Sequence, residues 1–138
     1  MSDAKPFELP VRVYYEDTDA QGVVYYANYF RFMERARTEW LGSLGVDMVR
    51  LQDAERRIFV VAEVNTKFHA PARLRDDLVV TARLHEMTRV TFDIEQKIYR
   101  DNTDGELLIS GIVKAAYLDA DTMRPKRIPS SLFGENQS

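Results

Sequence analysis

The clearest hydrophobic pattern in the chain predicts one long helix that ends near Leu44. Apolar side chains recur at three- and four-residue steps, at Tyr29, Met33, Ala36, Trp40 and Leu44. Three further apolar residues widen this stripe, at Phe30, Phe32 and Leu41. A helix with so broad an apolar face is covered on more than one side, so we expect Phe30, Met33 and Trp40 to be core residues.

Single residues predict the two ends of this helix. Asn28 is a candidate N-cap, because its side chain can accept a hydrogen bond from a free N–H group of the first turn. Gly45 suits the left-handed position just beyond the last turn, and Val46 can then fold back onto the helix.

The rest of the chain alternates with the period of β-strands. Before the helix, residues 1–8 are expected to be a loose lead-in and residues 11–15 a strand. After the helix, a connection over residues 46–57 with a short helical turn leads to four alternating stretches, at 59–68, 78–85, 90–99 and 107–118. Gly111, inside the last stretch, indicates a bulge or a close backbone approach.

These elements predict an α+β fold of one antiparallel sheet with the helix on its concave face, because short turns join antiparallel neighbours. The 138 residues, of which 45% are hydrophobic and 30% charged, fit a single domain over residues 1–138. Such a sheet leaves one edge unpaired, so we expect a homodimer built through an edge strand.

Composition narrows the classes of function. The net charge of −3 gives no field to attract nucleic acid, and the chain contains no cysteine, which excludes disulfides and a thiol nucleophile. Two histidines without an acidic cluster nearby predict no metal site. No apolar run is long enough to span a membrane and no secretory signal is visible, so we expect a cytoplasmic protein.

The stretch from Glu16 to Gly22 holds the most concentrated candidate chemistry. It places three carboxylates, a threonine and a glycine between the first strand and the helix. Such residues are ordinary turn formers, so residue type alone favours a structural role for Asp17 and Asp19 over a catalytic one.

The motifs around this turn resemble those of hotdog-fold acyl-CoA thioesterases. Tyr15-Glu-Asp-Thr-Asp19-x-x-Gly22-Val-Val-Tyr-Tyr-Ala-Asn28-Tyr and Met33-Glu-Arg-Ala-Arg-Thr-Glu39 are similar to the branch of 4-hydroxybenzoyl-CoA thioesterase and the YbgC-type, Tol–Pal-associated enzymes. Phe68-His-Ala-Pro-Ala-Arg-Leu-x-Asp76-Asp77 and Met123-Arg-Pro-Lys-Arg-Ile-Pro129 are similar to the YbgC type as well. The chain departs from the pattern at Gln21, where alanine or glycine is usual, and at Tyr26, where many YbgC-type members have histidine.

The resemblance implies a sheet wrapped around a central helix, with active sites between subunits. It also implies a homodimer with a continuous sheet, or a homotetramer in which two such dimers pair again. It assigns Asp19 as the catalytic carboxylate, acting as nucleophile or as general base, and the backbone N–H of Tyr26 as the group that polarises the thioester carbonyl. The neighbouring Gly22, Val23 and Val24 are expected to contact the substrate. Arg89 is expected to meet a phosphate of coenzyme A, an acidic ligand that favours arginine.

Several residues have both a structural and a chemical interpretation. Asp17, Glu16 and Thr18 are expected to shape the turn, and the Tyr26 ring to form a pocket wall. His69 and His85 are expected at the surface, whereas Lys126 and Arg127 are weaker candidates for phosphate contacts. Glu63 and Asn65 are candidates to line the site of a second subunit.

The resulting hypothesis is an acyl-CoA thioesterase that releases a free acid and coenzyme A, and this activity implies no metal or other cofactor. A hotdog dehydratase is disfavoured, because that chemistry needs a histidine near the central helix and residues 1–68 contain none. The alternative is a non-catalytic protein that binds acyl thioesters or acyl carrier protein beside envelope or phospholipid machinery. The acyl group, and the choice of coenzyme A or acyl carrier protein as its carrier, stay open.

Overall fold

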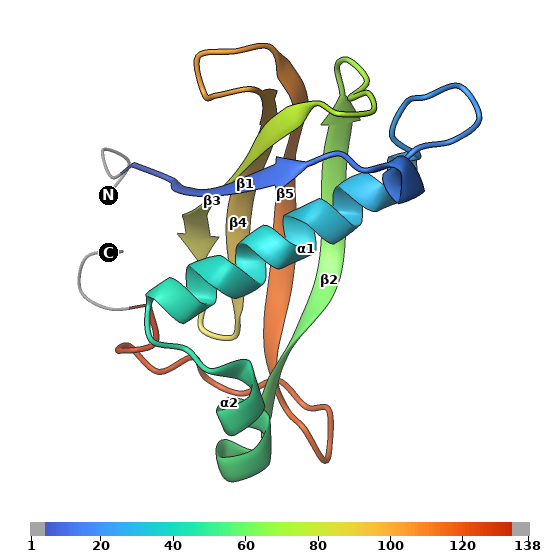
Figure 1. The fold of residues 1–138 in the computed structure, drawn as a ribbon. Coiled ribbons are helices and arrows are strands. Elements are labelled where there is room, and N and C mark those ends of the chain that lie inside the picture. The colour runs from blue at the N-terminus through green and yellow to red at the C-terminus, as the bar shows by residue number, and fades with distance from the viewer. Residues whose placement is uncertain (1–4, 134–138) are drawn as a thin grey trace.

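The computed structural model describes residues 5–133 and shows one sheet with a long helix across it (Figure 1). The elements follow in the order β1 (Phe7–Arg12), the 3-10 helix η1 (Tyr15–Asp17), α1 (Tyr26–Ser43), α2 (Met48–Glu55), β2 (Arg57–Phe68), β3 (Asp77–Met87), β4 (Thr91–Arg100) and β5 (Leu107–Asp119). The predicted α+β class is therefore confirmed. Within the described residues, no helix is long and apolar enough to cross a membrane.

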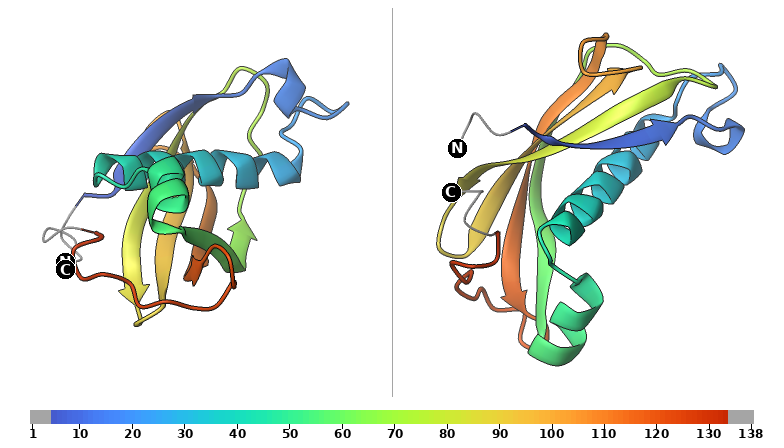
Figure 2. Two further views of the ribbon diagram at one scale, coloured as in Figure 1. Left: turned by 90° about the horizontal axis from the view of Figure 1, so that it is seen from below. Right: turned by 60° about the vertical axis from the view of Figure 1, so that its left-hand side comes forward.

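All five strands pair antiparallel, in the spatial order β1-β3-β4-β5-β2. Helix α1 lies across the concave face of this curved sheet, as the two views in Figure 2 show. Among the strands that the structure describes, β2 pairs only with β5, so its other side is an open edge.

Two clusters of buried side chains hold α1 on the sheet. One packs Tyr29, Phe32 and Met33 against the strands below the first half of the helix. The other surrounds Trp40, whose ring stacks on Phe133 with centroids 5.7 Å apart. The helix is thereby fixed at both of its ends, which sets the direction of its N-terminus.

The prediction that Phe30 is a core residue is wrong. Phe30 is 37% exposed, although it belongs to the apolar stripe of the sequence. It lies on the flank of α1 toward the edge strand β2, at the side where the sheet stops within the described residues. Its ring contacts Phe68 edge-on, with centroids 6.4 Å apart.

The predicted helix start is also wrong, whereas the predicted end is confirmed. The N-cap of α1 is Tyr25, and Asn28 lies inside the first turn, where its side chain donates to the Asp17 carbonyl over 2.9 Å. At the other end Gly45 has φ +89, and the Val46 N–H donates to the Leu41 carbonyl over 2.9 Å. These bonds form the closing motif expected of a glycine in this position.

Strand β1 begins and ends earlier than the alternation predicts. Residues 7–12 pair with β3, which corrects the strand predicted over residues 11–15 and the end of the lead-in predicted over residues 1–8. Residues 1–4 of that lead-in lie outside the described residues. Pro10 is compatible with β1 because an edge strand has only one neighbour to which its N–H groups must donate. The Tyr14 N–H already donates to the Asp17 side chain over 2.9 Å, so the chain has left the strand there.

Gly111 marks a close backbone approach and not a bulge. A Cβ atom there would lie 2.8 Å from the Asn65 carbonyl oxygen of β2. The register shift between β2 and β5 falls instead between Val61 and Glu63.

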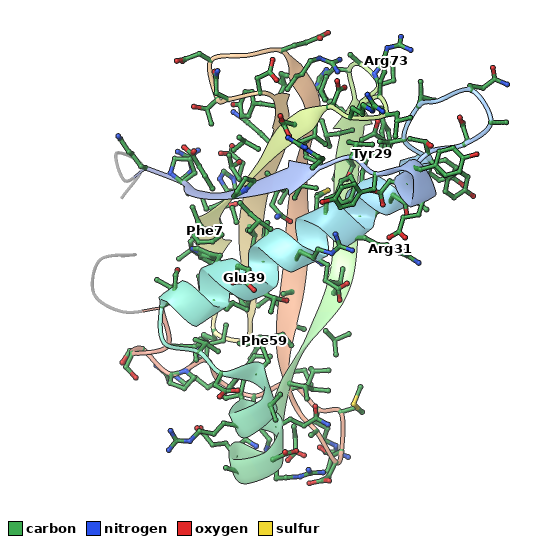
Figure 3. All side chains as sticks on the ribbon, in the orientation of Figure 1. Phe7, Tyr29, Arg31, Glu39, Phe59 and Arg73 are labelled. Carbon is green, nitrogen blue, oxygen red and sulfur yellow. The ribbon has the colours of Figure 1, made fainter. Side chains whose placement is uncertain are left out.

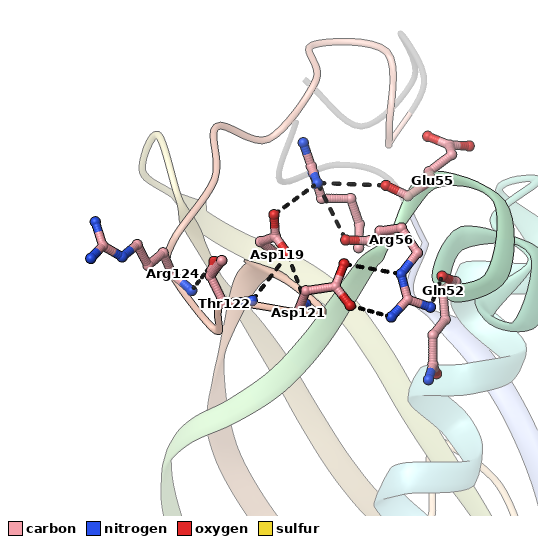
Figure 4. A network of polar contacts seen from close by, with 8 residues as sticks. Gln52, Glu55, Arg56, Asp119, Asp121, Thr122 and Arg124 are labelled. Atoms are coloured by element: carbon pink, nitrogen blue, oxygen red, sulfur yellow. Dashed lines mark hydrogen bonds and ion pairs between the residues drawn. The ribbon is translucent and has the colours of Figure 1, made fainter.

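The end of α2 is tied to the end of β5 by a polar network (Figure 4). The Arg56 guanidinium donates to both carboxylate oxygens of Asp121, over 2.5 and 3.2 Å, and this bond lowers the pKa of Asp121. Asp119 accepts the N–H groups of Asp121 and Thr122 over 2.7 and 3.2 Å, which lowers the pKa of Asp119. The network fixes the turn after β5 against the helix that leads into β2.

Candidate active site

The acidic stretch of the sequence folds into a tight hairpin ahead of α1. Thr18 bridges Val24, the Asp19 N–H donates to the Val23 carbonyl over 2.9 Å, and the Gly22 N–H donates to the Asp19 carbonyl over 3.1 Å. Gly22 has φ +79, in the left-handed region where a Cβ atom is unfavourable. The glycine therefore permits the reversal that brings the chain back to the helix.

Asp19 presents an exposed carboxylate at the start of this hairpin. Its Oδ1 atom accepts the Gln21 N–H over 2.8 Å. In the described part of the chain the other oxygen, Oδ2, has no hydrogen-bond donor. The backbone thus orients the carboxylate and leaves one oxygen free for chemistry.

Asp17 has the structural position that the sequence also allowed. It is 8% exposed, and its Oδ2 accepts the Tyr14 N–H over 2.9 Å. Its carbonyl accepts the Tyr25 N–H over 3.0 Å and the Asn28 side chain over 2.9 Å. Asp17 therefore joins the turn to the start of α1, two residues before Asp19.

The first N–H groups of α1 are available to a ligand. Among residues 5–133, the N–H groups of Tyr26 and Ala27 donate to no backbone acceptor. Such groups carry the positive end of the helix dipole and favour an anion or an oxygen with developing charge. The Tyr26 ring is 60% exposed and lies 4.9 Å from the Tyr25 ring, between centroids.

A second loop, over residues 69–76, is hydrogen-bonded to the hairpin. Ala72 accepts the Val24 N–H over 2.8 Å and donates its own N–H to the Tyr29 hydroxyl over 2.9 Å. The Leu74 N–H donates to the Gly22 carbonyl over 3.1 Å. Figure 3 shows Tyr29 and Arg73 together at this end of the molecule.

The sequence did not single out Tyr29 or Ala72 as parts of this arrangement. Burial raises the pKa of the Tyr29 phenol, so it stays a neutral hydroxyl that can accept from Ala72. The available signal was the Ala-Pro-Ala-Arg-Leu segment, but its contact with the hairpin depends on the tertiary fold.

The candidate substrate contacts next to Asp19 differ in their surroundings. Gly22 and Val23 are half-buried, and Val23 bridges Arg73. Val24 is 5% exposed and belongs to the core beside Tyr29. Its side chain therefore supports the hairpin from below.

Arg89 lies far from Asp19 within one chain. Arg89 follows the last residue of β3, whereas the loop beside the hairpin leads into the first residue of β3. The 11 residues of β3 span about 33 Å from one end to the other. The Ile128 N–H donates to the Arg89 carbonyl over 2.8 Å, so the tail with Lys126 and Arg127 lies beside Arg89. The fold thus gathers the three basic candidates at one end and Asp19 and Tyr26 at the other.

The remaining candidates lie at the surface. The His69 ring contacts the Ser110 hydroxyl at 2.8 Å, and His85 is exposed at the end of β3. Glu63 and Asn65 are exposed on the edge strand β2.

A groove of about 280 Å³ separates α1 from this edge strand. Its lining is Phe30, Arg31, Glu34 and Arg37 from α1, Val61 and Val64 from β2, and Val113 from β5. Phe30 follows Tyr26 by one helical turn, so the groove begins next to the free N–H groups. The exposed Phe30 side chain therefore forms a wall of this groove.

Comparison with known proteins identifies the family. Residues 13–134 match the model of the thioesterase-like superfamily. The chain belongs to this superfamily. It is 41% identical over 129 residues to the acyl-CoA thioester hydrolase YbgC of Escherichia coli O6:H1, and these residues make up 94% of each chain. It is 39% identical over 126 residues to the acyl-CoA thioesterase YbgC of Haemophilus influenzae, covering 91% of this chain and 90% of that one.

Membership of the thioesterase-like superfamily agrees with the fold. A probable thioesterase from Bartonella henselae superposes with a TM-score of 0.84 at 30% identity, over 91% of this chain and all of that one. The five-stranded antiparallel sheet around α1 is thus the hotdog fold that the motifs implied.

Proposed function

We propose that this member of the thioesterase-like superfamily hydrolyses an acyl-CoA thioester to a free acid and coenzyme A. The observation that carries the proposal is the position of Asp19 beside the start of α1. The carboxylate of Asp19 is exposed and oriented by a hydrogen bond from the Gln21 N–H. The free N–H of Tyr26 follows seven residues later, and the hairpin joins the two residues. The similarity to proteins named acyl-CoA thioester hydrolase supports this choice of reaction.

In this proposal the Tyr26 N–H donates to the thioester carbonyl oxygen. Negative charge develops on that oxygen when the carbonyl carbon is attacked, and a donor placed there typically accelerates the step about 100- to 1,000-fold. The free N–H and the helix dipole of α1 suit this role. The exposed ring of Tyr26 then forms part of the wall around the acyl group.

Asp19 supplies the second requirement by one of two routes. As a nucleophile, its oxygen attacks the carbonyl carbon, the C–S bond breaks, and water then hydrolyses the mixed anhydride. As a general base, it removes a proton from a water whose oxygen attacks the carbonyl carbon directly. In both routes the thiolate leaves and takes up a proton.

We further propose that two copies of the chain pair through β2 to complete the site. Strand β2 is an open edge with exposed Val61, Val64 and Phe68, an arrangement that single-chain proteins avoid. A second copy would also bring its Arg89 toward Asp19, which one chain does not do. Arg89 would then meet a phosphate of coenzyme A.

The proposal is tested by thiol release from short-chain, long-chain and hydroxybenzoyl thioesters of coenzyme A. Release of free thiol from at least one of them is the expected result. The same panel is titrated calorimetrically, because an acyl-binding protein without catalysis would bind thioesters and release no thiol. That outcome would replace the proposed enzyme by the non-catalytic alternative.

A further inference from the structure

Arg37 of α1 is a cation in a largely apolar groove with few partners. Its Nη1 atom donates to the Gln96 side-chain oxygen over 3.0 Å. Within the described residues, the guanidinium makes no other hydrogen bond and lies within 4.0 Å of no carboxylate. A guanidinium has five N–H donors, so most of its hydrogen-bonding capacity is unused.

Burial makes this arrangement unfavourable for the free protein. Desolvation lowers the pKa of Arg37, and the negative charge of Glu34, one turn earlier in α1, only partly opposes this shift. Arg37 is half-buried. A partly desolvated charge without a charged counterpart is unfavourable, so a site of this kind favours an incoming acceptor.

Gln96 holds Arg37 in a fixed direction. It is fully buried, and its amide nitrogen donates to the Met33 carbonyl of α1 and the Thr81 carbonyl of β3, over 3.0 and 3.3 Å. Because both acceptors engage the nitrogen, the amide oxygen must face Arg37. The guanidinium is therefore positioned before any ligand arrives.

The walls near Arg37 suit a hydrocarbon. Phe30, Val61, Val64 and Val113 line the groove, which starts one turn after Tyr26. Arg37 lies about 16 Å further along the helix axis than Tyr26, and its side chain leans back toward the N-terminus. A second cavity of about 100 Å³ shares Glu34, Arg37 and Val61 with the groove and extends to Phe59.

We propose that Arg37 is a specificity-determining residue that binds an oxygen acceptor, a carboxylate or a hydroxyl, at the far end of the substrate's acyl group. The groove takes the apolar stem of that group, while the thioester lies at Tyr26. This inference rests on the proposed thioesterase function and names the acyl class that function left open.

A carboxylate from a second copy of the chain is the competing partner for Arg37. Glu63 is the acidic residue of β2, but it lies opposite Lys114 of β5, which in turn pairs with Asp93 over 3.0 Å. Neighbouring residues of a strand point to opposite faces, and Val113 faces the groove, so Lys114 and Glu63 face away from it. Pairing through β2 therefore does not bring Glu63 of a second copy to Arg37.

The test compares matched acyl-CoA pairs that differ only at the far end. Octanoyl-CoA is measured beside its ω-hydroxy and ω-carboxy forms, and the six- and ten-carbon series are added to locate the optimal length. We expect wild-type kcat/KM to be at least about tenfold higher for an acceptor-bearing member, since a hydrogen bond to a charged group supplies that much discrimination. Equal kcat/KM values for the plain and the acceptor-bearing thioesters at every chain length would overturn the inference, and this result needs only the wild-type protein.

Variants then assign the preference to Arg37. Arg37→Met is expected to lose the preference, because kcat/KM should fall further for the acceptor-bearing thioester than for the plain octanoyl thioester, whereas Arg37→Lys should retain part of the preference. Arg35→Met, on the exposed side of the same helix, is the matched control and should keep the full preference. An equal loss for both members of a pair in folded Arg37→Met would show a structural role and contradict the inference.

Calorimetric binding of the same pairs to Asp19→Asn separates the two proposals. A binding preference without hydrolysis by wild type would contradict the proposed function and support the role of Arg37. Hydrolysis without any preference would contradict only the role of Arg37. Dimer dissociation caused by Arg37→Met would also contradict it, because the guanidinium would then serve the interface between copies.

Discussion

At the scale of single residues, the candidate site depends on which hydrogen bonds are already made. Asp17 and Asp19 look alike in the sequence, but the carboxylate of Asp17 is buried and bonded to Tyr14, whereas Asp19 keeps one oxygen free. The Tyr26 N–H is also free in the described part of the chain. Availability, and not residue type, thus distinguishes the groups proposed for catalysis from those that shape the turn.

Gly22 provides a prediction about backbone conformation. Gly22→Ala should lower the free energy of unfolding by about 1 kcal/mol, because a Cβ atom is unfavourable at φ +79. An added Cβ meets no atom within 4 Å, so we expect the variant to fold and its thioesterase rate to fall as the Asp19 turn relaxes. Urea unfolding and thiol release measure both effects.

Gly42→Ala is the control for this substitution. Gly42 lies in α1 with open space around it, so alanine there should leave activity unchanged and raise stability by about 0.5–1 kcal/mol. If both variants changed stability in the same direction, the conformational explanation for Gly22 would be wrong.

At the scale of elements, α1 is attached to the loop over residues 69–76 by one buried hydrogen bond. Tyr29→Phe removes the hydroxyl that accepts the Ala72 N–H and leaves that buried donor without a partner. We expect a loss of about 1–3 kcal/mol in the free energy of unfolding at pH 7. Tyr99→Phe, on the half-buried strand β4, is a comparison in which such a loss is not expected.

The difference in stability between wild type and Tyr29→Phe should also depend on pH. Burial raises the pKa of Tyr29 above its ordinary value of about 10, so its contribution is complete below that pH and is lost as the pH rises through the folded-state pKa. The stability difference between wild type and Tyr29→Phe should therefore narrow above about pH 10. A constant difference up to pH 11 would contradict the burial of a neutral phenol.

The connection between α2 and β5 predicts the opposite pH dependence. Backbone N–H groups lower the pKa of Asp119, so its contribution is complete above the ordinary value of about 3.9 and is lost as the pH falls further. Asp119→Asn should be less stable than wild type at pH 7, and the difference should shrink near pH 3. Asp104→Asn, in the exposed loop after β4, should show no such change in urea unfolding.

Much of this element arrangement could be predicted from the sequence, and the errors have physical causes. The stripe of α1, the closing Gly45 and the four later strands follow from periodicity, because each depends on local contacts. The start of β1 was missed since Pro10 is tolerated only by an edge strand, and strand order is not local information. Phe30 was misplaced for the same reason, as its exposure depends on β2 being the last strand.

At the scale of the whole molecule, the sheet separates the proposed groups. Asp19 and Tyr26 lie at one end of the fold, and Arg89 lies with Lys126 and Arg127 at the other. No periodicity in the sequence reports this separation, because it follows from the direction in which β3 runs. The separation is the reason to propose that a second copy completes each site through the open edge of β2.

Mixing two variants tests this assembly. Asp19→Asn and Arg89→Ala should each be impaired at low acyl-CoA concentration, the first in the chemical step and the second in binding. Unfolding and refolding them together should restore about a quarter of the wild-type rate, because half of the dimers are mixed and each mixed dimer has one intact site. Equally folded variants that recover no activity on mixing would show that each site lies within one chain.

The most direct test of the account compares thiol release by wild type, Asp19→Asn and Glu16→Gln on the best acyl-CoA substrate. Glu16 is an exposed carboxylate of the same turn, so it controls for the loss of negative charge. The account predicts that Asp19→Asn, with folding confirmed by circular dichroism, loses about 100- to 10,000-fold in kcat, while Glu16→Gln stays near wild type. Full activity in Asp19→Asn, or an equal loss in both variants, would contradict the assignment of Asp19 as the catalytic carboxylate.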